Sequence, residues 1–153
     1  MELLADYTPA LCGTVPLGCD LPTSDLDIAC CAPRLPPFAE VLRAHFGDQP
    51  GFECRTEPLG GVRSVVARFR TGRRRIEVVG QELPIFRQRA FVHMLAEALL
   101  LQRAGPEAIG EVRRLKREGR TTEEAFGELF ALAGDPYEAL VAIYEREILG
   151  VRG

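Results

Sequence analysis

Two aspartates separated by one residue, Asp25 and Asp27, are the side chains of this sequence best suited to chemistry. If residues 24–31 form a strand, both carboxylates share one face, while Leu26 and Ile28 share the other. Residues two apart on a strand lie about 6.5–7 Å apart at the backbone, so two carboxylates can converge on one divalent cation. Carboxylates, water and phosphate oxygens are the ligands that Mg²⁺ prefers. The pair therefore predicts a magnesium site.

A glycine followed by a hydroxyl residue, Gly13-Thr14, precedes this pair at the end of a strand predicted over residues 10–14. Glycine permits tight turns in which backbone N–H groups approach phosphate oxygens. Ser24, next to the first aspartate, offers a further hydroxyl. Together these residues predict that a phosphate binds beside the metal.

A third carboxylate, Glu77, stands between Ile76 and Val78 on a later predicted strand. This apolar-acidic-apolar order repeats the arrangement of the aspartate strand, so we expect Glu77 to bind the metal or to act as a base. The alternative is a surface glutamate paired with Arg75 or with a cross-strand Arg68, an interaction that contributes little to stability.

These three segments resemble the signature of the nucleotidyltransferase superfamily, the fold of polymerase beta and of aminoglycoside nucleotidyltransferases. That signature is a glycine motif, a spacer, an acidic-apolar-acidic-apolar stretch and a third carboxylate on a later strand. More narrowly, nearly the whole chain resembles an uncharacterised bacterial family of small nucleotidyltransferase-like proteins, catalogued as a domain of unknown function. The segments that carry this second resemblance are Cys12–Gly18, Ser24–Ile28, Gln88–His93, Lys116, Thr122–Phe126 and Gly134–Tyr137.

The resemblance implies an enzyme that uses Mg²⁺ or Mn²⁺ to transfer a nucleoside monophosphate from a nucleoside triphosphate to an unknown small-molecule or protein acceptor. The implied roles are metal binding and catalysis for Asp25, Asp27 and Glu77, and nucleotide binding for Gly13, Thr14, Ser24, His93 and Lys116. The alternative is a catalytically inactive nucleotide- or partner-binding module, such as one half of a toxin–antitoxin-like pair.

For His93 and Lys116, a second interpretation stays open beside nucleotide binding. Arg89, His93 and Glu97 lie four residues apart and form one stripe of a predicted helix, which faces either the site or solvent. Lys116 either contacts phosphate or is a solvated basic residue of the kind expected near a helix C-terminus.

The order of the predicted elements favours an α+β fold: a nucleotidyltransferase-like core over residues 1–83, and a four-helix region over residues 84–153 packed on it as one compact unit. A helix follows Pro37 and ends near Gly47, and three antiparallel strands are joined at Gly60-Gly61 and Thr71-Gly72. Four helices follow: residues 85–103, a helix from Gly105-Pro106 to Gly119, one capped by Thr121 and Glu124, and one after Gly134-Asp135-Pro136.

The 153 residues carry a formal net charge of −3, so no global basic field recruits nucleic acid, and we expect none as a partner. The 46% hydrophobic and 27% charged residues are an ordinary globular balance. No apolar run approaches the ~20 residues needed to span a bilayer. The acidic N-terminus lacks signal-peptide organisation and five cysteines are an odd number, so we expect reduced thiols in the cytoplasm; a homodimer stays open. We reject a zinc site at Cys12, Cys19, Cys30 and Cys31 on spacing, and a ribonuclease motif at Arg87 and His93 as too loose.

Overall fold

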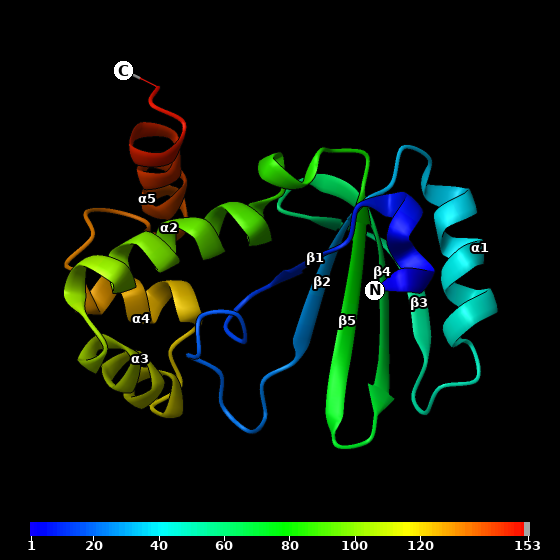
Figure 1. Cartoon of the computed structure of the whole chain (residues 1–153), viewed down its shortest axis with the longest axis horizontal. Helices are drawn as coiled ribbons and strands as arrows, with labels where there is room; N and C mark the ends of the chain where they lie inside the picture. The colour runs from blue at the N-terminus through cyan, green and yellow to red at the C-terminus, as the bar shows by residue number, and fades with distance from the viewer. Residues whose placement is uncertain (152–153) are drawn as a thin grey trace. The chain divides into compact units, whose positions relative to one another are not determined.

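The structure is a computed structural model that describes residues 1–151 and has the predicted α+β class (Figure 1). The strands are β1 (Ala10–Cys12), β2 (Leu26–Cys31), β3 (Glu53–Leu59), β4 (Val62–Thr71) and β5 (Arg74–Gln81). The α-helices are α1 (Leu35–Phe46), α2 (Arg89–Ala104), α3 (Glu107–Arg117), α4 (Thr122–Leu129) and α5 (Pro136–Ile143). Short 3₁₀ turns η1 (Glu2–Tyr7) and η2 (Ile85–Arg87) and a π-helical turn η3 (Tyr144–Ile148) complete the described elements.

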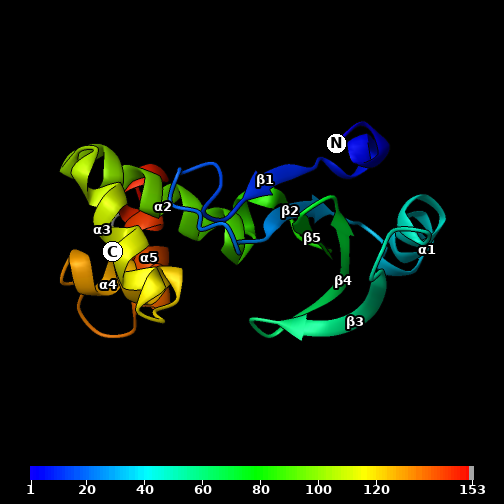
Figure 2. The same cartoon turned by 90° about the horizontal axis from the view of Figure 1, so that it is seen from below.

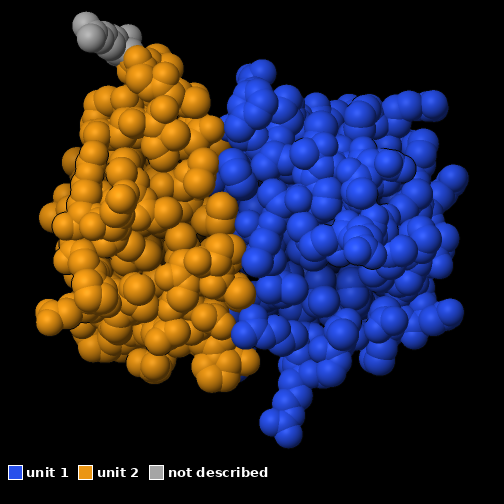
Figure 3. All heavy atoms as spheres, viewed as in Figure 1, with its two compact units in different colours: residues 1–12, 23–91 blue, residues 13–22, 92–153 orange. Residues whose placement is uncertain are grey.

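The chain forms two compact units (Figure 3). Unit 1 contains Met1–Cys12 and Thr23–Phe91, and unit 2 contains Gly13–Pro22 and the chain from Val92 onward. This division differs from the predicted boundary at residue 83. The buried Gln88 side chain donates to the carbonyls of Cys30 and Leu83, each at 2.9 Å, which keeps the segment up to Phe91 with the sheet.

Unit 1 is a mixed sheet with the strand order β1-β2-β5-β4-β3. β2 and β5 are parallel, whereas the other neighbours are antiparallel, as predicted for β3, β4 and β5. Figure 2 shows α1 against one face of the curved sheet. Phe38 and Leu42 of α1 are fully buried there among alternate strand residues, including Ile28, Ala67 and Val78. The side chains between these positions therefore point to the opposite face.

The first two strands are shorter than predicted. β1 ends at Cys12, because Cys12 and Asp27 form the last pair of the β1–β2 ladder, and β2 begins at Leu26, which pairs with Ile76 of β5. Gly13 follows with a φ of 72°, a left-handed conformation that turns the chain out of the ladder. Asp25 and Ser24 therefore precede β2 rather than lie in it.

Unit 2 is helical, apart from the loop of residues 13–22. The capping box predicted for α4 is present: the Thr121 hydroxyl accepts from the Glu124 backbone N–H at 3.1 Å, and the Glu124 carboxylate accepts from the Thr121 N–H at 2.8 Å. The buried members of its two apolar clusters are Cys19, Leu101, Ala108, Val112, Leu115, Ala125 and Phe126 in one, and Val92, Ala96, Leu140, Ile143 and Tyr144 in the other. Over residues 1–151, no helix combines the length and the apolar character that a membrane crossing requires.

Candidate functional site

A row of polar side chains crosses all five strands of unit 1 on the face opposite α1. The strand register places Glu53, Arg68, Glu77, Asp27 and Cys12 side by side in that order. The residues next to Asp27 and Glu77 along their strands, such as Ile28 and Val78, point into the core, so the two carboxylates share the other face. The structure thus brings two of the three predicted metal ligands together on adjacent parallel strands.

The third carboxylate, Asp25, lies two residues before Asp27. Its Oδ2 atom is 3.0 Å from Nε of Arg75, which lies two residues before Glu77 on β5. The two side chains are 27% and 49% exposed respectively, so this ion pair is in contact with solvent. It forms a second charged row immediately beside the first.

Glu77 is held by Arg68, one of the two partners that the surface alternative named. Arg68 Nε donates to Oε2 of Glu77 at 2.6 Å, and Arg68 Nη2 donates to Oε1 of Glu57 at 3.0 Å. Burial acts to lower the pKa of the Arg68 guanidinium, but these two carboxylates outweigh it and raise that pKa above its ordinary value. Arg68 is therefore a fixed cation between Glu77 and Glu57.

The other predicted nucleotide-binding residues, apart from Ser24, belong to unit 2. Gly13 and Thr14 begin its loop, and Thr14 is 7% exposed. Lys116 of α3 donates from Nζ to the carbonyl of Cys19 at 3.4 Å, so it holds the far end of the same loop. The structure therefore assigns a backbone contact to Lys116, which sequence reasoning had left between a phosphate contact and a solvated role.

His93, also in unit 2, is buried and paired with a residue that sequence reasoning missed. Its Nδ1 atom lies 3.2 Å from Oε1 of Glu123, on α4. Burial acts to raise the pKa of Glu123, but its hydrogen bond with His93 and further hydrogen bonds outweigh it and lower that pKa. An ionised Glu123 accepts only, so Nδ1 carries the hydrogen and donates it. His93 Nε2 is enclosed and forms no hydrogen bond within the described residues.

Glu97, one helical turn after His93, is the most deeply buried carboxyl group described, with 2% exposure. Burial and the nearby charge of Glu123 raise its pKa to about 8, although Lys116 acts in the opposite direction. The stripe of Arg89, His93 and Glu97 is therefore split: its last two members are buried, while Arg89 is exposed. The sequence signal for this cluster was the occurrence of two polar residues four apart within an apolar stretch of helix.

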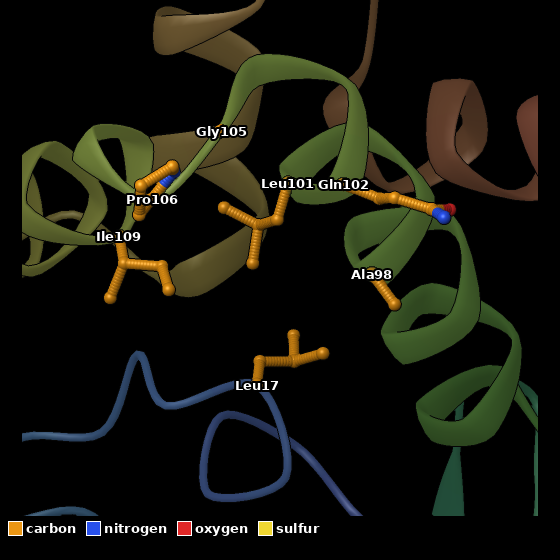
Figure 4. Close-up of a pocket in the computed structure, with 7 residues that line it drawn as sticks. All are labelled: Leu17, Ala98, Leu101, Gln102, Gly105, Pro106 and Ile109. Atoms are coloured by element: carbon orange, nitrogen blue, oxygen red, sulfur yellow. The ribbon is translucent and has the colours of Figure 1, made fainter.

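Unit 2 also contains an apolar cavity of about 400 Å³. Leu17 of the loop and Leu101 of α2 point toward each other across it, and Ile109 and Pro106 line one side (Figure 4). Among the residues 1–151 that line it, Gln102 alone has a polar side chain. Because no charged group lines the cavity, it is a poor site for a phosphate.

The profile of a family described as "Domain of unknown function (DUF4269)" matches residues 1–143. The chain belongs to the DUF4269 family. No curated protein and no solved structure matches it. The match bears out the narrower of the two resemblances at the level of a domain of unknown function, while a place in the nucleotidyltransferase superfamily remains a prediction.

The charged rows of this DUF4269 protein fit a magnesium ion in the chemistry of their donors, which are the carboxylates of Asp27 and Glu77 on the sheet and of Asp25 just before β2. In the conformation described, however, arginines hold Asp25 and Glu77, and no three or more His, Cys, Asp or Glu side chains within residues 1–151 are arranged to hold a metal. Partly exposed ion pairs contribute only about 0–1 kcal/mol each. A divalent cation bound here would have to compete with Arg68 and Arg75 for these carboxylates.

The cysteines of this DUF4269 protein are free thiols. Burial raises the pKa of Cys12 and Cys19 to about 11 and that of Cys30 to about 12. Thiols that stay protonated at neutral pH are poor nucleophiles and poor metal ligands. Cys12, beside Asp27 in the row, therefore adds no charge to the site.

Proposed function

We propose that this protein is a magnesium-dependent nucleotidyltransferase-like enzyme, which transfers a nucleoside monophosphate from a nucleoside triphosphate to a small-molecule or protein acceptor. The observation that carries the proposal is the register of β2 and β5, in which Asp27 lies directly opposite Glu77. Asp25, held by Arg75 in the adjoining row, supplies the third carboxylate.

In this proposal the carboxylates of unit 1 act on the reacting groups. An acceptor hydroxyl oxygen attacks the α-phosphorus, its proton passes to Glu77, and the bond to the leaving pyrophosphate breaks. Asp25 and Asp27 would hold a magnesium ion and, with it, orient the triphosphate. Mg²⁺, when bound, neutralises phosphate charge and lowers the pKa of the attacking hydroxyl. The nucleotide-binding roles of Gly13, Thr14, Ser24, His93 and Lys116 stay predictions.

A transfer assay tests the proposal. The purified protein is incubated with Mg²⁺, each of the four nucleoside triphosphates labelled at the α-phosphate, and a cell extract as the source of acceptors. We expect label to enter a product from one triphosphate, with release of pyrophosphate. Asp27→Asn removes one carboxylate from the centre of the row and is expected to lower the rate by about 10²-fold or more, because it removes charge stabilisation at the reacting group.

Glu53→Gln is the matched control. Glu53 lies in the same row and carries the same charge, but it pairs with Arg55 at 3.0 Å on the outermost strand and is 56% exposed. We expect this variant to retain transfer. Absence of both nucleotide binding and transfer in folded wild-type protein, or equal transfer by Asp27→Asn and Glu53→Gln, would overturn the proposal.

A non-catalytic nucleotide- or partner-binding module is the second candidate. The observation that favours it is that Arg68 and Arg75 already neutralise Glu77 and Asp25. A module binds a triphosphate equally well with Mg²⁺ or with a chelator and gives no labelled product. Isothermal titration under both conditions separates it from the enzyme.

A further inference from the structure

The hairpin that joins β4 and β5 carries a cluster of arginines at its turn, at the lower end of the sheet in Figure 1. Arg70 lies directly opposite Arg75, and Arg73 and Arg74 follow the turn residue Gly72. All four arginine side chains are exposed. We call these four residues the arginine hairpin.

The arginine hairpin has more positive charge than its surroundings neutralise. Like charges that lie directly opposite each other in an antiparallel pair are destabilising, and Arg70 and Arg75 are such a pair. Arg75 contacts Asp25, but Arg70 and Arg73 form no ion pair with any residue in the range 1–151. A bound anion would relieve the repulsion between Arg70 and Arg75.

The arginine hairpin adjoins the candidate site. Arg70 lies two residues from Arg68, and Arg75 lies two residues from Glu77. Arg70 and Arg75 therefore share the face opposite α1 with the carboxylate row. Residues two apart on a strand lie about 6.5–7 Å apart, so a further anionic group of a ligand bound at the carboxylate row can reach Arg70 and Arg75. Guanidinium groups match phosphate because two N–H donors can bind two oxygens together.

We propose that the arginine hairpin binds a phosphate group of the substrate, either the triphosphate of the nucleotide or a phosphate on the acceptor. This inference rests on the proposed function, which identifies the reacting group. It concerns only the binding of phosphate by the arginine hairpin. Phosphate binding would draw Arg75 from Asp25 and release that carboxylate for a cation. Anion and cation would then each raise the other's affinity, as linkage requires.

Isothermal titration of the whole chain tests the inference, with inorganic tripolyphosphate, ATP and ribose 5-phosphate as probes. The test variant combines Arg70→Gln with Arg73→Gln. The control combines Arg55→Gln with Arg63→Gln, which removes the same charge from exposed positions of β3 and β4. We expect the test variant to lose about tenfold or more in affinity, because it loses charge-assisted hydrogen bonds, and the control to lose less than about threefold, since its charges are screened.

The probes separate the two sources of phosphate. Weaker binding of tripolyphosphate and ATP by the test variant assigns the hairpin to the nucleotide, and weaker binding of ribose 5-phosphate alone assigns it to the acceptor. Equal losses in test and control variants, no binding of any probe, or tighter binding of a short single-stranded RNA than of all three probes would overturn the inference. Unchanged melting temperatures of both double variants show that each is folded.

Failure of this inference differs from failure of the proposed function. If Asp27→Asn abolishes transfer while the hairpin variant binds every probe normally, only the hairpin assignment falls. If the hairpin variant loses phosphate binding while wild-type protein transfers nothing, only the enzymatic proposal falls. The magnesium linkage adds a check: wild-type protein should bind ATP more tightly with Mg²⁺, and Asp25→Asn should reduce that gain.

Discussion

Replacing Glu97 by glutamine tests whether this carboxyl group is protonated in the folded chain at neutral pH. Burial and the charge of Glu123 raise its pKa from 4.5 to about 8. Between these two values the unfolded chain has released a proton that the folded chain still holds. The free energy of unfolding must therefore fall as pH rises through this range.

The magnitude follows from the size of the shift. One pKa unit corresponds to about 1.4 kcal/mol, so the full effect is on the order of 4–5 kcal/mol. This is a large part of the ~5–15 kcal/mol that stabilises an ordinary domain. The contribution is fully present below the unfolded pKa of 4.5 and is lost as pH rises to the folded pKa of about 8.

Other shifted groups act outside this window. The lowered pKa of Glu123 gives stability that is present above its unfolded pKa of 4.5 and is lost only below that value. The buried thiols of Cys12, Cys19 and Cys30, with ordinary pKa values of 9.0, affect stability only at higher pH. A slope between about pH 5 and about pH 8 therefore isolates Glu97 from these groups.

The assay is urea unfolding followed by far-ultraviolet circular dichroism at several pH values across that window. Wild-type protein should lose about 1.4 kcal/mol of unfolding free energy per pH unit from this group, and Glu97→Gln should remove that loss. The control is Glu145→Gln, an exposed position in unit 2, which should keep the wild-type slope. Equal pH dependence of the unfolding free energy in wild type and Glu97→Gln would refute the reasoning. A packing defect in the variant would instead lower its unfolding free energy by a similar amount at every pH.

Three further substitutions test the packing and capping of the fold by thermal or urea unfolding. Gly80→Ala should destabilise unit 1 by about 1–3 kcal/mol, because the added methyl group would overlap the buried Phe38 ring. Gly110→Ala should stabilise α3 by about 0.5–1 kcal/mol, since this helical glycine has open space around it; loss of stability there would contradict the helix argument. Thr121→Ala should cost about 1 kcal/mol through loss of the α4 cap, whereas Thr121→Ser should retain most of it.

Local chemistry explains why much of the fold was predictable from sequence. The side chains of Thr121 and Glu124 accept hydrogen bonds from each other's backbone N–H groups within one helical turn. A capping box can therefore be predicted from the local sequence alone. Gly60-Gly61 and Gly72 permit the left-handed turns that fold β3, β4 and β5 into consecutive hairpins. These features depend on neighbours in the chain, and the structure confirms them.

The candidate site was predictable only in part. Asp27 and Glu77 each stand between two apolar residues on a strand, and this alternation predicted that both carboxylates lie on the face of the sheet away from the core. The sequence offered Arg68 and Arg75 as equal partners for Glu77. In the register of β4 and β5, Arg68 lies opposite Glu77 and pairs with it, while Arg75 pairs with Asp25.

By itself the sequence determined the α+β class, the antiparallel hairpins, and the placement of two carboxylates, Asp27 and Glu77, on strands with the right alternation, whereas Asp25 lies just before its strand. The tertiary structure alone decided that Asp27 lies opposite Glu77, about fifty residues away in the chain, because parallel pairing joins segments that no local turn connects. It alone decided that Glu97 is buried beside Glu123. Burial depends on which helices pack together, and the free energy of that packing is spread over many contacts distant in sequence.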